Sequence, residues 1–334
     1  MPVGIEQDSS GLMVLCFMVR PTYFRDPFFI DSLKRYPYVR DPADGPKEED
    51  YLLVRPLHYD ESNEDVVRIP AQSFIDQQIN LDVETNLGFI FHISRCGSTL
   101  VTQMLSSSDR FFVLSEPSII NSLLDPSLEI EKTSRAELLR ASMAALRKVA
   151  PERVDFFFLK FRSWNIFCVD TVLAAFPRTS WIFLHRNGLE VLSSLLAKPP
   201  GWLRARANCA RYFSEFLGVD ASTVTAMDDD EFIARMLGSF CRIAMKHSSP
   251  STHFLDYIDL KKELIELLRR AWGIVISEND ARRVLEASKI YSKDTEKRKE
   301  FVPDSEAKRS AATPHQIKVV EEFAESERRK ILWR

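Results

Sequence analysis

One short stretch of the chain has the residue types of an anion-binding turn, Ser94-Arg95-Cys96-Gly97-Ser98-Thr99. It follows the apolar run 88–93, expected to be a buried strand, and precedes the amphipathic stretch 100–107, expected to be a helix. The first N–H groups of a helix lack partners within it and, together with the helix dipole, attract an anion. Gly97 would let the main chain approach that anion closely. A plain helix start capped by Ser98 or Thr99 is the alternative.

A cation and a hydroxyl suited to a phosphate stand further along the chain. Arg186 directly follows the apolar run 181–185, and Ser194 lies eight residues later on the expected helix 189–196. A guanidinium offers a forked pair of donors to a phosphate, and the serine adds another donor. In the alternative, Arg186 only pairs with Glu190, one helical turn away.

A carboxylate and a lysine stand at the ends of two other apolar runs. Glu116 follows the run 111–114, and Lys160 lies near the end of the run 156–161. Ligands of open α/β sheets bind outside the carboxyl ends of the strands, which is where both side chains are expected. A lysine in so apolar a segment needs an anionic partner. The alternatives are a carboxylate that marks a helix start near Ser118 and a lysine paired with a structural carboxylate.

These side chains depend on a sheet for their placement. Nearly continuous apolar runs of four to six residues suit strands buried on both faces, and five occur, at 88–93, 111–114, 156–161, 181–185 and 253–258. Helical patterns lie between them, at 100–107, 134–149, 166–176 and 189–196. This alternation predicts an α/β fold with a parallel sheet flanked by helices and right-handed crossovers. Residues 203–248 are expected to form a helical lobe inserted before the last strand.

The two ends of the chain differ from this middle part. Residues 1–86 contain many prolines and short apolar runs, which predict a small N-terminal module that is β-rich or irregular, separate from an α/β domain at 87–334. After the last strand we expect amphipathic helices at 260–272 and 279–288, a polar loop at 294–312 and a charged helix at 314–329.

Composition narrows the class of protein. The 334 residues include 45 Lys and Arg against 48 Asp and Glu, a net charge of -3, which argues against a dedicated nucleic-acid binder. The 5 cysteines are odd in number and widely spaced, so we expect reduced thiols in a cytoplasmic protein and neither a zinc site nor a disulfide framework. No apolar run approaches the roughly 20 residues needed to span a bilayer.

The motifs together resemble the PAPS-dependent sulfotransferases, which share the P-loop nucleotide fold. The turn is not a Walker A motif, since it has neither the first glycine nor the Gly-Lys pair. It resembles instead the family's 5′-phosphosulfate loop, in the variant with arginine seen in bacterial and tyrosylprotein-type members. Arg186 and Ser194 are similar to the family's 3′-phosphate site, with Asn187-Gly188 in place of Asp-Pro. Tyr257 matches the tyrosine beside the adenine. The resemblance covers about 87–273, with a looser fit to 312.

The resemblance implies roles for particular residues. Glu116 would be the general base, with Arg95 and Lys160 as cations on the transferring group and Arg162 in reserve. The donor PAPS (3′-phosphoadenosine 5′-phosphosulfate) and its product PAP would bind a larger set without a metal: Arg95, Cys96, Gly97, Ser98, Thr99, Leu100, Arg186, Ser194, Tyr257, Lys308 and Arg309. For Lys308 and Arg309 a solvated charge cluster is the alternative, and for Tyr257 a core position. His92 and His185 are expected to be core histidines.

The acceptor would be a hydroxyl compound of unidentified class. Its pocket is expected from the N-terminal module and from residues 197–247, where Trp202 stands near Arg204, Arg206 and Arg211. Lobe packing plus solvated charge is the alternative for this group. Two other functions stay open. One is an unusual P-loop kinase that uses ATP, and the other is a nucleotide-binding module without catalysis. The oligomeric state is open as well.

Overall fold

We describe the protein from a computed structural model. It describes residues 2–7, 13–18, 66–76, 78, 82–126, 128, 130–148, 150, 154–289 and 305–333. For the strands among residues 2–69 it describes the backbone alone.

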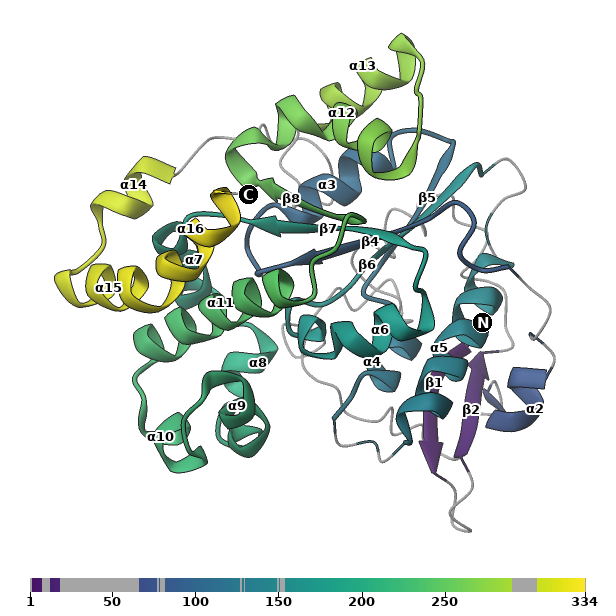
Figure 1. Ribbon diagram of the computed structural model, residues 1–334, viewed down its shortest axis with the longest axis horizontal. Coiled ribbons are helices and arrows are strands. Elements are labelled where there is room, and N and C mark those ends of the chain that lie inside the picture. The colour runs from purple at the N-terminus through teal and green to yellow at the C-terminus, as the bar shows by residue number, and fades with distance from the viewer. Residues whose placement is uncertain are drawn as a thin grey trace, which may run out of the picture.

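A five-stranded parallel sheet forms the centre of the molecule (Figure 1). Its strands are β4 (Leu87–His92), β5 (Phe111–Ser115), β6 (Phe156–Lys160), β7 (Ser180–His185) and β8 (Thr252–Asp256), in the spatial order β5-β6-β4-β7-β8. The predicted α/β class with a parallel sheet is confirmed, and all five expected strands are present. One boundary differs in a way that matters: Tyr257 was expected inside the last strand, but it begins the 3₁₀ turn η4 (Tyr257–Asp259) after β8.

The apolar character of the strands follows from their burial. Every residue of β4, β5 and β6 is buried, so both faces of these strands are covered and no polar alternation is seen. Phenylalanine rings fill much of this core. Phe91 stacks on Phe161 with ring centroids 4.3 Å apart, and Phe89 meets Phe161 edge to face at 5.2 Å.

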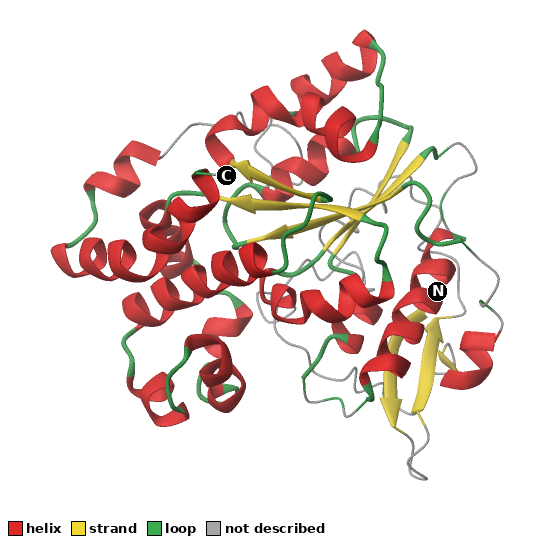
Figure 2. Ribbon diagram, viewed as in Figure 1, coloured by secondary structure: helices red, strands yellow, loops and turns green. Residues whose placement is uncertain are grey.

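Helices cover both faces of the sheet, as the red and yellow ribbons of Figure 2 show. On one side lie α3 (Ser98–Leu105), α12 (Leu260–Trp272) and α13 (Glu278–Ala287). On the other lie α4 (Ser118–Leu123), α5 (Lys132–Arg147), the 3₁₀ helix η3 (Ser163–Cys168) and α6 (Val169–Ala175). The helix α7 (Gly188–Ala197) follows β7 and leads to the lobe.

The expected helical lobe is present. It consists of α8 (Gly201–Arg204), α9 (Ala210–Leu217), α10 (Ala221–Ala226) and α11 (Asp229–Lys246). Trp202 is only 3% exposed and packs against the rings of Phe232 and Phe240, with centroids 5.9 and 6.0 Å away. Its aromatic surface therefore holds the lobe together, which was the packing alternative considered for it.

The C-terminal part contains more helix than the sequence predicts. The stretch 294–312, expected to be a loop, contains α14 (Ser305–Ser310), so that expectation is wrong for the residues that carry Lys308 and Arg309. The expected charged helix is one helical run made of α15 (Pro314–Val319), the π-helix η5 (Val320–Glu325) and α16 (Ser326–Leu332). Figure 1 shows this run, in yellow, beside α7 and α11.

The described part of residues 1–86 is β-rich. An antiparallel sheet of β1 (Pro2–Gln7), β2 (Met13–Met18) and β3 (Val66–Pro70) is followed by α2 (Ala71–Asp76). In Figure 1 this small sheet lies beside α5, apart from the central sheet. The proposed boundary between a module at 1–86 and a domain at 87–334 stays a prediction.

Candidate functional site

The carboxyl edge of the central sheet brings the predicted site residues together. Because all five strands are parallel, each of them ends at this edge. In spatial order the residues that follow the strands are Glu116 after β5, Phe161 after β6, the turn 93–97 after β4, Arg186 after β7 and Tyr257 after β8. The strand order reverses at β4, the position where open sheets of this kind bind ligands. The turn therefore lies between a carboxylate–lysine pair and an arginine–tyrosine pair.

The turn after β4 has the backbone of an anion cradle. Ser94, Arg95 and Gly97 all have positive φ, at 77°, 46° and 86°. Such a series points successive N–H groups toward one concavity. Gly97 is the N-cap of α3, which begins at Ser98. The alternative of a helix capped by Ser98 or Thr99 is thus wrong, and a glycine cap has no side chain that could take the N–H groups of the first helical turn.

The side chains of this turn contribute unequally. Cys96 is fully buried, and burial raises the pKa of its thiol to about 12, so the thiol stays protonated. Ser98 and Leu100 are also buried, at 5% and 4% exposed, whereas Thr99 is half-buried. For Cys96 and Leu100, only the backbone can meet a ligand at this place.

Hydrogen bonds of the buried His92 side chain fix the shape of the turn. Its Nδ1 accepts a hydrogen bond from the Ser94 N–H at 3.0 Å, and its Nε2 donates to the Phe161 carbonyl oxygen at 3.1 Å. Burial, assisted by the charge of Lys160, lowers the pKa of His92 to about 3, so the ring is neutral and can do both. The expected core histidine therefore connects β4, β6 and the turn.

Glu116 is held in a strained backbone conformation. Its φ is 55°, unusual for a residue with a Cβ. The Glu116 N–H donates to the Lys160 carbonyl at 2.7 Å, and the Asn121 side-chain Nδ2 donates to the Glu116 carbonyl, also at 2.7 Å. These two bonds hold the backbone on both sides of the carboxylate. α4 does begin at Ser118, but the Glu116 carboxylate pairs with cations instead of marking this helix start.

Glu116 and Lys160, predicted separately, form an ion pair with each other. Lys160 Nζ lies 2.6 Å from Glu116 Oε1, and Arg162 Nε lies 3.8 Å from Glu116 Oε2. The Lys160 side chain is 5% exposed, and that of Glu116 is 35% exposed. Burial favours the protonated form of Glu116, but Lys160, with help from Arg162, outweighs it and lowers the pKa of the carboxyl group. The lysine's alternative, a carboxylate partner, is thus realised with the predicted base itself.

The turn and the arginine–tyrosine pair share one site. A Cβ on Gly97 would lie 2.6 Å from Tyr257 Cδ2, so the tyrosine ring rests directly on the glycine. The guanidinium carbon of Arg186 lies 4.1 Å from the centre of the Tyr257 ring, and Arg186 Nη1 lies 3.5 Å from the Arg95 carbonyl oxygen. Gly97 and Arg186 therefore both contact Tyr257 at the carboxyl edge of the sheet.

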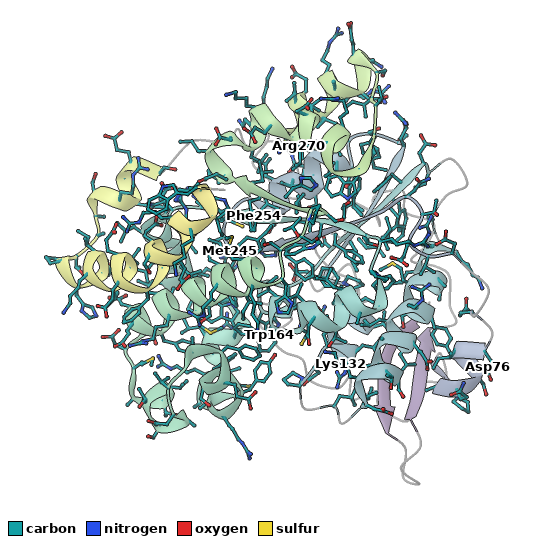
Figure 3. All side chains as sticks on the ribbon, viewed as in Figure 1. Asp76, Lys132, Trp164, Met245, Phe254 and Arg270 are labelled. Carbon is teal, nitrogen blue, oxygen red and sulfur yellow. The ribbon has the colours of Figure 1, made fainter. Side chains whose placement is uncertain are left out.

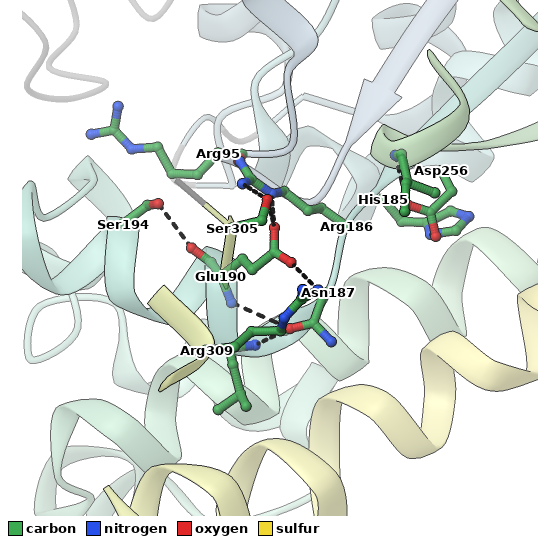
Figure 4. A network of polar contacts seen from close by, with 12 residues as sticks. Arg95, His185, Arg186, Asn187, Glu190, Ser194, Asp256, Ser305 and Arg309 are labelled. Carbon is green, nitrogen blue, oxygen red and sulfur yellow. Dashed lines mark hydrogen bonds and ion pairs between the residues drawn. The ribbon is translucent and has the colours of Figure 1, made fainter. Parts of the chain in front are cut away.

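A buried carboxylate organises the cations around Arg186 (Figure 4). Glu190 accepts from Arg186 Nε at 2.6 Å, from Arg309 Nη1 at 2.9 Å and from the Ser305 hydroxyl at 2.8 Å. The pairing of Arg186 with Glu190 that stood as the alternative is therefore present, and it also brings Arg309 of α14 to the site. The Ser194 hydroxyl donates to the Glu190 carbonyl at 2.8 Å.

Two predicted groups lie away from this cluster. The Arg95 guanidinium donates to the Lys198 carbonyl at 2.9 Å, after the far end of α7. In the lobe, Arg206 pairs with Asp229 at 3.0 Å and lies over the Phe232 ring at 5.3 Å, so this arginine takes part in the packing of the lobe. Trp164, labelled in Figure 3, lies two residues beyond Arg162 and is half-buried, with its ring 6.3 Å from that of Phe213.

Sequence reasoning missed several residues of the site. Asn121 and Ser305 carry no motif, and only their contacts identify them. Glu190 was considered only as a competitor for Arg186, although its second oxygen holds Arg309. The helical pattern that places Glu190 one turn after Arg186 is the only signal in the sequence for any of the three.

The comparisons with known proteins give a resemblance of fold. No protein-family model and no curated protein matches the chain. Among solved structures, the chain is similar to the sulfotransferase domain of the Synechococcus PCC 7002 olefin synthase, with 16% identity over 72% of this chain and 95% of that one and a TM-score of 0.44. A sulfotransferase of Mycobacterium tuberculosis H37Rv matches with 16% identity over 76% and 81% of the two chains, TM-score 0.43. A mouse sulfotransferase complexed with PAP matches with 13% identity over 78% and 91%, TM-score 0.39.

These structures belong to the family that the motifs resemble. At identities of 13–16%, the likeness extends to the fold alone. Within the described residues, no helix has the length and apolar character needed to cross a membrane. The same part of the chain contains no cluster of three or more His, Cys, Asp or Glu side chains arranged for a metal ion.

Proposed function

We propose that the protein transfers a sulfuryl group from PAPS to a hydroxyl group of an acceptor. The observation that carries the proposal is the arrangement along the sheet edge. The glycine turn lies between a carboxylate–lysine pair, suited to deprotonate a hydroxyl, and an arginine–tyrosine pair, suited to hold a nucleotide. Binding and chemistry are thus divided between the two sides of a single turn.

The residues on the β7–β8 side fit the nucleotide. Arg186 would hold the 3′-phosphate, with Arg309 and Lys308 of α14 adding positive charge nearby. Ser194 would add its hydroxyl to the same group. Tyr257 would meet the adenine with the edge or face of its ring. The backbone N–H groups of the turn and of the first turn of α3 would receive the 5′-phosphosulfate, which is the anion that this cradle suits.

The residues on the β5–β6 side fit the chemistry. PAPS supplies a sulfuryl group joined to a good leaving group, so the chain must only deprotonate the acceptor and offset negative charge. Glu116 would take the proton. Lys160 would stabilise the sulfuryl oxygens, with Arg162 as a further cation. Arg95 would join them once its guanidinium leaves the Lys198 carbonyl. A lysine that turns from Glu116 to an incoming anion leaves the carboxylate with a higher pKa, and thus a stronger base.

Ligand-dependent melting distinguishes this function from its alternatives. A ligand that binds the native state raises the melting temperature by mass action. PAP without metal should raise it, and ADP with magnesium should not. The reverse result would favour the kinase. Binding of PAP without turnover on any acceptor in a broad screen of hydroxyl compounds would favour the non-catalytic module.

One substitution tests the assignment of the base. Glu116→Gln should keep the PAP affinity of the parent, because the residue lies on the acceptor side, and lose turnover with an acceptor found by the screen. General-base catalysis contributes typically about 10²- to 10⁴-fold. Full turnover in this variant would remove Glu116 from the mechanism. The cytoplasmic location expected from the cysteines and the class of the acceptor stay predictions.

A further inference from the structure

The C-terminal helical run is tied to the start of α7 by a buried carboxylate. Glu325, the last residue of the π-helix, accepts a hydrogen bond from the Gly188 N–H at 2.6 Å, and its side chain is 8% exposed. Asn187 caps the following N–H groups of α7 with its side chain. The first turn of the helix that follows Arg186 is therefore fixed partly by a residue from the other end of the described chain.

A second tie reaches the end of β8. Arg328 of α16 donates to Asp256 Oδ2 at 2.9 Å and lies 3.3 Å from Glu325 Oε2. The side chains of Arg328 and Asp256 are 12% and 10% exposed. The His185 Nδ1 lies 3.6 Å from the same Asp256 oxygen, and Figure 4 shows these two side chains next to each other. One guanidinium thus bridges the carboxylate at the end of β8 and the carboxylate that caps α7.

The residues that Arg328, Asp256 and Glu325 hold in place lie within two positions of a predicted donor-site residue in the chain. His185 precedes Arg186, Asp256 precedes Tyr257, and Gly188 follows Arg186 by two positions. We propose that the C-terminal helical run is a positioning element of the donor site, which sets Arg186 and Tyr257 through Arg328 and Glu325. This inference rests on the function proposed above, and it assigns a role to a segment that the sulfotransferase motifs do not include.

The packing leaves this element little freedom. A Cβ on Gly188 would lie 2.8 Å from Val320 Cγ1, and one on Gly238 would lie 2.0 Å from the Phe323 carbonyl oxygen. The run therefore lies against two glycine positions, one on α7 and one on α11. The wider turn of the π-helix includes Phe323 and ends at Glu325, so it sets where the capping carboxylate stands.

The contacts of Arg328 with Asp256 and Glu325 are electrostatic as well as steric. Without Arg328, the carboxylates of Asp256 and Glu325 would lose their shared cation. Asp256 is next to Tyr257 in the chain, and Glu325 lies beside α7, the helix that follows Arg186. Buried like charges repel, and they oppose the binding of a second anion nearby. Loss of Arg328 should therefore weaken nucleotide binding by displacement and by repulsion together.

Calorimetric titration of PAP into two variants tests the inference. Arg328→Met keeps the length of the side chain and removes its charge, and we expect the dissociation constant of PAP to rise at least about tenfold. Turnover at saturating PAPS should stay within about threefold of the parent, because Glu116 and Lys160 stand on the other side of the turn. Arg328→Lys keeps the positive charge but loses the two-pronged guanidinium, so its loss of PAP affinity should be smaller. If the methionine variant does not fold, the lysine variant provides the test.

Arg235→Met is the matched control. Arg235 lies over the Phe323 ring at 3.8 Å and pairs with Glu231 at 2.7 Å, so it holds the same π-helix from the side of α11. This variant should bind PAP like the parent. Parent-like affinity in the Arg328 variants would overturn the inference, and so would an equal loss in the control, which would mean general loosening. A parent that does not bind PAP would refute the proposed function itself, and the inference with it.

Discussion

At the scale of single residues, the proposed acid–base chemistry depends on which charges are in contact. Lys160 keeps Glu116 ionised, and the positive φ of Glu116 directs its carboxylate from a backbone held on both sides. Strained residues of this kind persist only where their surroundings hold them. The carboxylate is partly exposed while the lysine is buried, so the proposed base is accessible from solvent and its cation is not.

The Glu116–Lys160 pair gives a prediction for pH dependence. In Lys160→Met the pKa of Glu116 should rise, because burial of the carboxylate is no longer outweighed by the lysine. If Glu116 is the base, as proposed, activity needs its ionised form and is lost as the pH falls through that pKa. We therefore expect turnover about 10²- to 10³-fold below the parent, the scale for one lost charge stabiliser, and an acid limb moved to higher pH. A rate profile against pH measures both, and an unmoved acid limb would contradict the pairing.

His92 gives a prediction for stability against pH. Its pKa is about 3 in the folded protein against 6.5 for a free histidine, so the unfolded chain binds the extra proton between these values. The contribution of His92 to the free energy of unfolding is fully present above about pH 6.5. It is lost as the pH falls toward 3, by at most about 1.4 kcal/mol per pH unit. In His92→Gln this part of the slope should vanish. Urea unfolding at several pH values measures it, and equal slopes in parent and variant would contradict the buried neutral ring.

At the scale of elements, the turn after β4 works only as a unit with η4. Tyr257 rests on Gly97, and Arg186 rests on Tyr257, so three strand ends are stacked through two contacts. The glycine is required twice, once for its φ of 86° and once for the absence of a Cβ. A change in the turn should therefore reach the proposed 3′-phosphate arginine.

Gly97→Ala separates these two requirements when it is compared with a second glycine. The new Cβ must displace the Tyr257 ring, and with it Arg186, so PAP affinity should fall more than about tenfold. Gly218 has a similar φ of 68° at the end of α9 but no atom within 4 Å of an added Cβ. Gly218→Ala should carry the backbone strain alone and bind PAP normally. Calorimetry compares the two, and equal affinities would disprove the stacking role of Gly97.

At the scale of the whole molecule, the C-terminal helical run packs against α7 and α11, from the middle of the chain. The backbone of the π-helix approaches α11 at Gly238 so closely that no side chain fits between them. Such an approach brings two helices into contact along their backbones and lets Phe323 and Glu325 reach their partners. The molecule therefore depends on a contact between residues that are far apart in the sequence.

Gly238→Ala tests this contact. In an ordinary helix interior the change from glycine to alanine stabilises by up to about 1 kcal/mol. Here the new Cβ would lie 2.0 Å from a backbone oxygen, and backbone cannot move aside as a flexible side chain can. We expect the sign to reverse, with a loss of about 1–3 kcal/mol as for other overpacked sites. Urea unfolding measures it, and a more stable variant would contradict the close approach.

Much of the fold could be predicted because short sequence patterns of neighbouring residues determine its strands and helices. Apolar runs such as 156–161 mark strands, since a strand covered on both faces has no polar side. The helix after β4 and the glycine turn before it were recognised from neighbouring residues. The α14 helix was missed because five of its six residues are polar and the sixth is an alanine, so it has no periodic apolar face, and only docking against α7 reveals it.

The sequence by itself determined the strands, the turn and the residue types at the ends of the strands, because apolar runs and glycine positions act over a few residues. Only the tertiary structure decided that Glu116 and Lys160 pair, that Tyr257 rests on Gly97, and that Glu325 reaches the start of α7 and Arg328 the end of β8. Strand order and long-range docking decide these contacts. They join residues tens to more than a hundred positions apart, which no local pattern can encode.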